Sequence, residues 1–133
     1  MRQSVLIVDD NPHMRKLVRS RFESQSDFQI CGEAENGQDA IEKAKQFKPD
    51  LIILDFSMPV MDGITAASIL SQTIPAARLI LFTMHSSPLV DAAARTAGIS
   101  AVIAKEHGLE QLVSQVQTIL GLPSTGRSLA RGI

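Results

Sequence analysis

The sequence predicts an α/β fold in which an open, parallel sheet of five strands carries helices on both faces. The chain has 133 residues, of which 44% are hydrophobic and 20% charged, which is typical of one globular domain. Strand-like segments begin at intervals of 22 to 28 residues, and each interval is long enough for a helical crossover between parallel strands. Helical periodicity fills the stretches between them. This alternation is typical of a sheet with helices on both sides.

Four of the five predicted strands are short, continuous apolar runs. Such runs are typical of parallel strands that are covered on both faces, and they occupy residues 5–8, 51–54, 79–82 and 101–104. The remaining strand has a weaker, alternating pattern that suits the edge of a sheet. It lies at residues 28–33, where two sets of side chains would point to opposite faces of the sheet. The first set is Phe28, Ile30 and Gly32, and the second is Gln29, Cys31 and Glu33.

Five helices are predicted from apolar stripes at helical spacing, within residues 14–22, 40–47, 64–70, 90–97 and 109–120. Asn11 is a candidate N-cap for the first, followed by Pro12 in the first turn. The turns Asn36-Gly37 and Asp62-Gly63 precede the second and third helices. Residues 122–133 lose the periodicity, so we expect one domain over residues 1–121 and a tail or linker after it.

Composition and charge disfavour several functional classes. There are 13 Lys and Arg residues against 14 Asp and Glu, so a net charge of −1 argues against nucleic-acid binding by this chain alone. The longest apolar runs are far shorter than the roughly 20 residues of a membrane span. Asp9 and Asp10 come too early for a signal-peptide apolar stretch, and Cys31, the single cysteine, cannot form an internal disulfide. We therefore expect a cytoplasmic domain without a membrane partner.

Polar side chains follow four of the predicted strands. Asp9 and Asp10 follow the first strand, Asp55 the third, Thr83 the fourth and Lys105 the fifth. Ligands of open α/β sheets bind beyond the carboxyl ends of the strands, so these groups should converge. Clustered carboxylates repel one another unless a cation joins them, and their oxygens suit Mg²⁺. One carboxylate can serve as a nucleophile that forms an aspartyl phosphate, with the lysine and hydroxyl stabilising phosphoryl oxygens.

These residues together resemble the receiver domain of two-component response regulators. The resemblance rests on Asp9-Asp10, the segment LIILDFSMPVMDG at residues 51–63, Thr83 and Lys105, and it extends over residues 4–121. The segment CGEAENGQDAIEKAKQFKPDLIILD and the closing helix are most similar to receivers of LuxR-type, helix-turn-helix transcriptional regulators. The resemblance implies a flavodoxin-like, doubly wound (βα)5 fold with strand order 2-1-3-4-5.

The resemblance also implies a role for each residue at the strand ends. Asp55 would accept a phosphoryl group from a sensor histidine kinase or phosphotransfer protein, in a phosphorelay that controls transcription through a domain outside this chain. A homodimer is a further implied partner. The chain would then be a signalling domain rather than an enzyme. The implied direct ligands of Mg²⁺ are Asp10, Asp55 and the Ser57 main-chain carbonyl, and Asp9 would bind it through water. Thr83 and Lys105 would stabilise the phosphoryl oxygens.

Three positions depart from the family pattern. Val102 stands where an aromatic residue is usual, Met84 where a small one is usual, and Glu106 where Pro or Asp is common. Val102 and Met84 are therefore candidate residues for switching and for access to Asp55. They also keep open an alternative function, a pseudo-receiver that docks proteins without responding to phosphorylation. A flavin-binding protein is disfavoured because Trp and Tyr are absent, and an aspartate-based phosphatase because Ser57 replaces its second Asp.

Overall fold

The computed structural model describes residues 2–122 and contains one five-stranded sheet in the order β2-β1-β3-β4-β5. All four neighbouring pairs are parallel, so the predicted fold class and strand order are confirmed. The segment 28–33 is confirmed as an edge strand, and the first strand begins at Gln3, two residues earlier than predicted. The strands are β1 (Gln3–Val8), β2 (Phe28–Ala34), β3 (Leu51–Leu54), β4 (Arg78–Thr83) and β5 (Ala101–Ala104).

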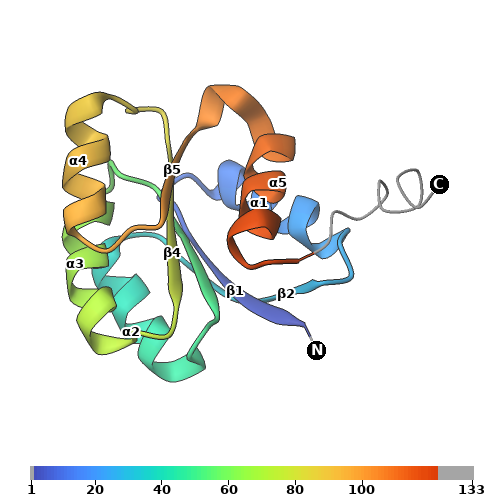
Figure 1. The fold of residues 1–133 in the computed structure, drawn as a ribbon. Coiled ribbons are helices and arrows are strands. Elements are labelled where there is room, and N and C mark those ends of the chain that lie inside the picture. The colour runs from blue at the N-terminus through green and yellow to red at the C-terminus, as the bar shows by residue number, and fades with distance from the viewer. Residues whose placement is uncertain (1, 123–133) are drawn as a thin grey trace.

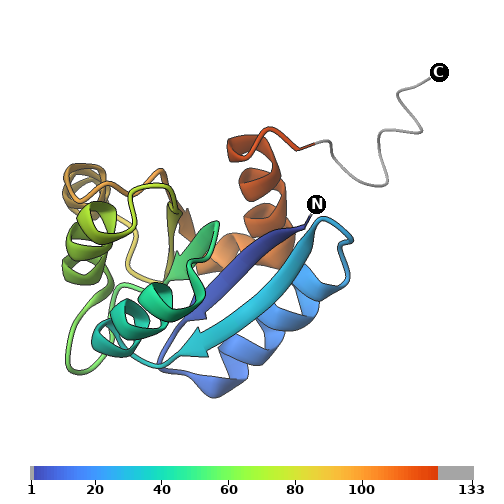
Figure 2. The same cartoon turned by 90° about the horizontal axis from the view of Figure 1, so that it is seen from below.

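Helices cover both faces of this sheet. In Figure 1, α1 and α5 lie on one side of the strands, and α2, α3 and α4 lie on the other. Figure 2 shows the same layers from below, with α1 alongside β1 and β2. The helices are α1 (Pro12–Glu23), α2 (Gly37–Phe47), α3 (Gly63–Thr73), α4 (Pro88–Thr96) and α5 (Gly108–Ile119), with a short 3-10 turn at Lys105–His107 that the sequence did not predict.

The apolar runs form two cores, one on each side of the sheet. In β1, Val5 and Ile7 pack toward α1 and α5, whereas Leu6 and Val8 pack toward the opposite helices. Successive side chains of a strand point to opposite faces, so a strand with helices on both sides must be apolar throughout. This explains why the central strands show no polar alternation.

Side chains cap the N-termini of three helices: Asn11, the predicted N-cap, and Asn36 and Asp62, which lie in the predicted turns. Asn11 accepts from the main-chain N–H of His13 at 2.9 Å, Asn36 from that of Asp39 at 2.8 Å, and Asp62 from that of Thr65 at 2.8 Å. These bonds satisfy N–H groups that have no partner within the helix. The caps matter for function because Asn11 and Asp62 begin the helices that follow β1 and β3.

A β-bulge in β2 overturns the predicted alternation of that strand. The pairing with β1 passes from Val5–Ile30 to Leu6–Gly32 and so leaves Cys31 as an extra residue. Cys31 packs with the core that contains Leu6, and a side chain added at Gly32 would meet Leu6 and Phe47 of the same layer. Two successive residues therefore face α2. Because of this shift, Glu33 faces α1, whose Arg15 and Arg19 it binds.

Two other expectations need correction or fall outside the described residues. The apolar stripes of α1, α2 and α4 are narrower than predicted, since Leu17, Phe47 and Ala93 are exposed. Apart from Leu122, the predicted tail lies outside the residues that the structure describes. Among residues 2–122, no helix is long and apolar enough to cross a membrane.

Candidate functional site

Four adjacent strands bring the predicted site residues to one edge of the sheet. Asp9 follows β1, Asp55 follows β3, Thr83 ends β4 and Lys105 follows β5. The main-chain N–H of Asp55 donates to the Val8 carbonyl at 2.9 Å, which fixes the two strand ends beside each other. Asp9, Asp55 and Thr83 are only 4%, 7% and 0% exposed. Their polar groups are thus held in a nearly closed setting.

Lys105 lies between two of the carboxylates. Its Nζ is 2.7 Å from Asp9 Oδ2 and 3.5 Å from Asp55 Oδ1, and its side chain is 8% exposed. One oxygen each from Asp9, Asp10 and Asp55 lies within 4.8 Å of the others. Among residues 2–122, this is the only group of three or more acidic, His or Cys ligand atoms that could hold a metal ion.

The pKa of Asp55 shows the electrostatic cost of this arrangement. Burial raises the pKa of the Asp55 carboxyl, and the neighbouring Asp9 charge raises it further. Lys105 and the Phe56 N–H, which donates to Asp55 Oδ1 at 2.9 Å, act in the opposite direction. One ammonium cannot neutralise three carboxylates, so the cluster retains negative charge. A cation at this position would relieve it.

The donor set fits Mg²⁺. Mg²⁺ prefers oxygen ligands, retains several waters and takes only one or two protein carboxylates directly. Asp10 is exposed, whereas Asp9 and Asp55 are buried, so the cluster opens to water on the Asp10 side. Asp9 Oδ2 already accepts from Lys105, which suits an indirect role for Asp9.

Close packing of the main chain supports the loop after Asp55. A Cβ atom on Gly63 would lie 2.0 Å from the Asp55 carbonyl oxygen, so only glycine fits there. Val60 has φ 70°, and Met61 N–H donates to the Pro59 carbonyl at 2.7 Å, which together form a tight γ-turn. Ser57 lies exposed in this loop.

Thr83 is oriented by the segment that follows it. Its Oγ accepts from the main-chain N–H of His85 at 3.1 Å, which leaves the hydroxyl proton to donate elsewhere. The His85 and Phe56 rings meet edge to face, 6.3 Å between centroids. Two residues adjoining the site, one after Asp55 and one in the loop after β4, therefore pack together.

Met84 and Val102, two of the three residues that depart from the family pattern, are not among the residues that form the acidic cluster. Met84 is 68% exposed in the loop after β4, so most of its side chain faces solvent. Val102 is half-buried and packs against the core between the sheet and α2, α3 and α4. Their roles in access and switching stay predictions.

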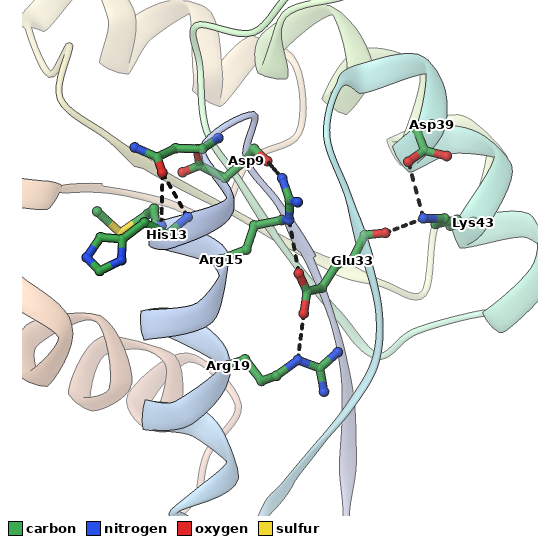
Figure 3. A network of polar contacts seen from close by, with 9 residues as sticks. Asp9, His13, Arg15, Arg19, Glu33, Asp39 and Lys43 are labelled. Carbon is green, nitrogen blue, oxygen red and sulfur yellow. Dashed lines mark hydrogen bonds and ion pairs between the residues drawn. The ribbon is translucent and has the colours of Figure 1, made fainter.

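Sequence reasoning missed Arg15 of α1. Its Nη1 donates to the Asp9 main-chain carbonyl at 2.7 Å, and its Nε pairs with Glu33 at 2.9 Å (Figure 3). A main-chain contact leaves no signature in side-chain type or spacing. The bulge that turns Glu33 toward α1 was not predicted either, so the sequence offered no signal for this interaction.

Comparison with known proteins gives a family match and several close relatives. Residues 5–117 match the family described as "Response regulator receiver domain". Chemotaxis protein CheY of Halobacterium salinarum is 34% identical over 120 residues, which cover 90% of this chain and 98% of that protein. Protein-glutamate methylesterase/protein-glutamine glutaminase 1 of Methanosarcina acetivorans is 46% identical over 79 residues, 59% of this chain. The matched stretch is only 23% of that relative's length.

Solved structures agree in fold. A LuxR-family response regulator from Aurantimonas sp. superposes with a TM-score of 0.86 at 27% identity, covering 98% of this chain and 94% of the other. The CheX-CheY complex with BeF3 and Mg from Borrelia burgdorferi gives 0.84 at 28% identity, with 89% of both chains covered. On the family match, the CheY relative and this shared fold, the chain belongs to the response regulator receiver domain family.

Proposed function

We propose that this receiver domain accepts a phosphoryl group on Asp55, with Mg²⁺, and passes the signal on through a change of its surface. The observation that carries the proposal is the convergence of Asp9, Asp10, Asp55 and Lys105 at one sheet edge. Carboxylates crowded in this way cost stability, and a site of this kind is a candidate for function.

Phosphoryl transfer would use the residues as follows. A carboxylate oxygen of Asp55 attacks the phosphorus of a phosphohistidine, the P–N bond breaks, and the imidazole of the donor leaves as its electron pair returns to nitrogen. Lys105 pairs with the incoming phosphoryl oxygens and Thr83 donates its hydroxyl proton to them. Asp10, Asp55 and the Ser57 carbonyl would hold the metal directly, and Asp9 through water. Bound Mg²⁺ would neutralise charge on the transferring phosphoryl group.

The donor would be a sensor histidine kinase or phosphotransfer protein. Family membership supports this, and the relative from Borrelia burgdorferi was crystallised with BeF3, Mg and CheX. We propose that the output is carried by a domain outside this chain, by analogy with the methylesterase relatives, of which the matched stretch is only 23% and 22%. We propose transcription as the output, in line with the LuxR-family neighbours.

Intact mass spectrometry tests the phosphoacceptor. With a small phosphodonor and Mg²⁺, the mass should rise by one phosphoryl group, and Asp55→Asn should abolish the rise. Asp62→Asn is the matched control, since it alters a nearby carboxylate of the same loop while Asn can still cap α3. A full gain of mass in Asp55→Asn would overturn the assignment.

The alternative, a docking module that does not respond to phosphorylation, rests on Val102 and Met84, and the packing of Val102 supports it. A stiff, β-branched side chain already packed in the core cannot swing as a large ring would. Backbone NMR of the free and phosphorylated domain separates the two functions. Amide shifts confined to the neighbours of Asp55 would support docking, whereas shifts that extend along α4 and β5 support signalling.

A further inference from the structure

A network of charged residues connects α1, β2 and α2 with the acidic site. Figure 3 shows Glu33 at its centre, between Arg15 and Arg19 of α1 and Lys43 of α2, with Arg15 reaching on to Asp9. The network borders an open hollow of about 350 Å³ that Arg15, Glu33 and Lys43 help to line. The Arg15–Glu33 pair of this network is partly buried, with side chains 18% and 29% exposed.

Every polar group of Asp9, in its main chain and its side chain, makes a hydrogen bond. Its main-chain N–H donates to the Ala34 carbonyl at 3.0 Å, and its carbonyl accepts from Arg15 Nη1 at 2.7 Å. Its carboxylate accepts from the Asn11 N–H at 2.9 Å and from Lys105. Among these hydrogen bonds of Asp9 within residues 2–122, only the one from Arg15 acts on the peptide that joins Asp9 to Asp10. The orientation of that peptide directs the Asp10 side chain.

Arg15 is in turn fixed from the other side. Its Nε pairs with Glu33 Oε1 at 2.9 Å, while the second oxygen of Glu33 pairs with Arg19 Nε at 2.6 Å. Lys43 donates to the Glu33 main-chain carbonyl and so restrains the strand at this residue. A guanidinium can hold two acceptors in a fixed fork, which a lysine ammonium on its flexible stem does less well.

We propose that Arg15 is a positioning residue that orients the Asp9–Asp10 peptide so that the acidic cluster is arranged for Mg²⁺. The inference rests on the proposed metal site. Outer contacts that orient metal ligands typically change metal affinity by about 10- to 100-fold when they are removed. Arg15 performs this role through main chain rather than by touching the ion.

The charge and the geometry of Arg15 predict opposite effects on metal affinity. A positive charge near the site repels Mg²⁺, so its removal should tighten binding if charge were all that mattered. If Arg15 orients the peptide, its removal should weaken binding despite the more negative site. The sign of the change therefore separates the two explanations.

Isothermal titration with Mg²⁺ of wild type, Arg15→Met and Arg19→Met measures this sign. Each variant loses one positive charge and one partner of Glu33, but only Arg15 contacts Asp9. We expect Arg15→Met to bind Mg²⁺ about 10-fold more weakly, and Arg19→Met to bind it as well as wild type or slightly better. Arg15→Lys, which retains the charge, should fall between wild type and Arg15→Met. Equal or tighter binding by Arg15→Met, or equal weakening by both Met variants, would overturn the positioning role.

Amide NMR of the metal-free domain gives a second measurement. Arg15→Met should move the Asp10 amide resonance, whose N–H belongs to the oriented peptide, and Arg19→Met should not. An unmoved Asp10 amide overturns the inference even if metal affinity falls. A wild-type domain that binds no Mg²⁺ would overturn the proposed metal site together with this inference, whereas normal wild-type binding with an unaffected Arg15→Met overturns this inference alone.

Discussion

At the scale of single residues, the ionised carboxylate of Asp55 is unfavourable in the folded protein. Burial and the Asp9 charge raise the pKa of its carboxyl in the folded protein. Between the unfolded and folded pKa values the folded state binds more protons than the unfolded state. The free energy of unfolding therefore falls as pH rises through this interval, and the whole penalty is present above the folded pKa.

We therefore expect Asp55→Asn to raise the melting temperature of the metal-free domain at neutral pH. Asparagine carries no charge to desolvate, and Lys105 keeps Asp9 as its partner at 2.7 Å. The gain should shrink as pH falls toward about 4, where an unfolded Asp also becomes protonated. Thermal melts from pH 4 to 8 test this. A variant that melts below wild type at pH 7, or whose gain does not depend on pH, would contradict the explanation.

Side chains at the strand ends could be predicted from the sequence, whereas their supporting contacts could not. Asp9, Asp55, Thr83 and Lys105 follow apolar runs that are recognisable locally, and parallel strands bring such ends together in any sheet of this kind. Arg15 acts on a main-chain carbonyl, and that contact depends on how helix α1 packs against β2. It arises from tertiary packing rather than from any local pattern.

At the scale of elements, Gly63 joins the start of α3 to the strand end that carries Asp55. A Cβ there would lie 2.0 Å from the Asp55 carbonyl oxygen. We expect Gly63→Ala to lower the free energy of unfolding by about 1–3 kcal/mol, the usual cost of overpacking, and to slow phosphorylation because Asp55 must shift. Ser68→Ala, on the exposed side of the same helix, is the matched control. Urea unfolding measures the first effect and phosphorylation rates the second. If Gly63→Ala matches Ser68→Ala in both the free energy of unfolding and the phosphorylation rate, the close contact between Gly63 and Asp55 does not constrain the loop.

Helix caps and central strands were predictable because each depends on a few neighbouring residues. Asn11 caps its helix as its type and position predict, and the predicted turns at Asn36 and Asp62 lie at the starts of the helices that these side chains cap. The bulge at Cys31 depends on pairing with Val5 and Leu6, 25 or more residues away, and nothing in the alternation of β2 reveals it. The fold class therefore follows from local patterns, whereas the face on which Glu33 lies follows from strand pairing.

At the scale of the whole molecule, the charge balance predicts no DNA binding by this chain. Its net charge is −1, and strong duplex binding needs several phosphate contacts by Lys and Arg, each releasing counterions. Fluorescence anisotropy with a labelled duplex at physiological salt should show no binding below micromolar concentration. Sub-micromolar binding that weakens steeply with salt would reveal a basic surface that the net charge conceals.

The face formed by α4 and β5 provides the surface through which we expect phosphorylation to be communicated. Leu89 of α4 is 83% exposed. Arg95 of α4 and Val102 of β5 line a hollow of about 180 Å³ on this face. β5 is an edge strand and directly precedes Lys105. A shift of Thr83 and Lys105 toward a phosphoryl group would therefore move the ends of β4 and β5, and with them this face.

On that basis we expect the phosphorylated domain to dimerise through its last two βα units. Standard interfaces bury about 800 Å² on each partner, and Leu89 is the largest exposed apolar side chain that α4 could contribute to such an area. Leu89→Ser should therefore abolish the dimer. Ile69→Ser removes an exposed apolar residue of α3 and should leave dimerisation intact. Sedimentation velocity with and without a phosphodonor measures the oligomeric state. A domain that stays monomeric when phosphorylated, or a dimer that Leu89→Ser leaves unchanged, would place communication elsewhere on the surface.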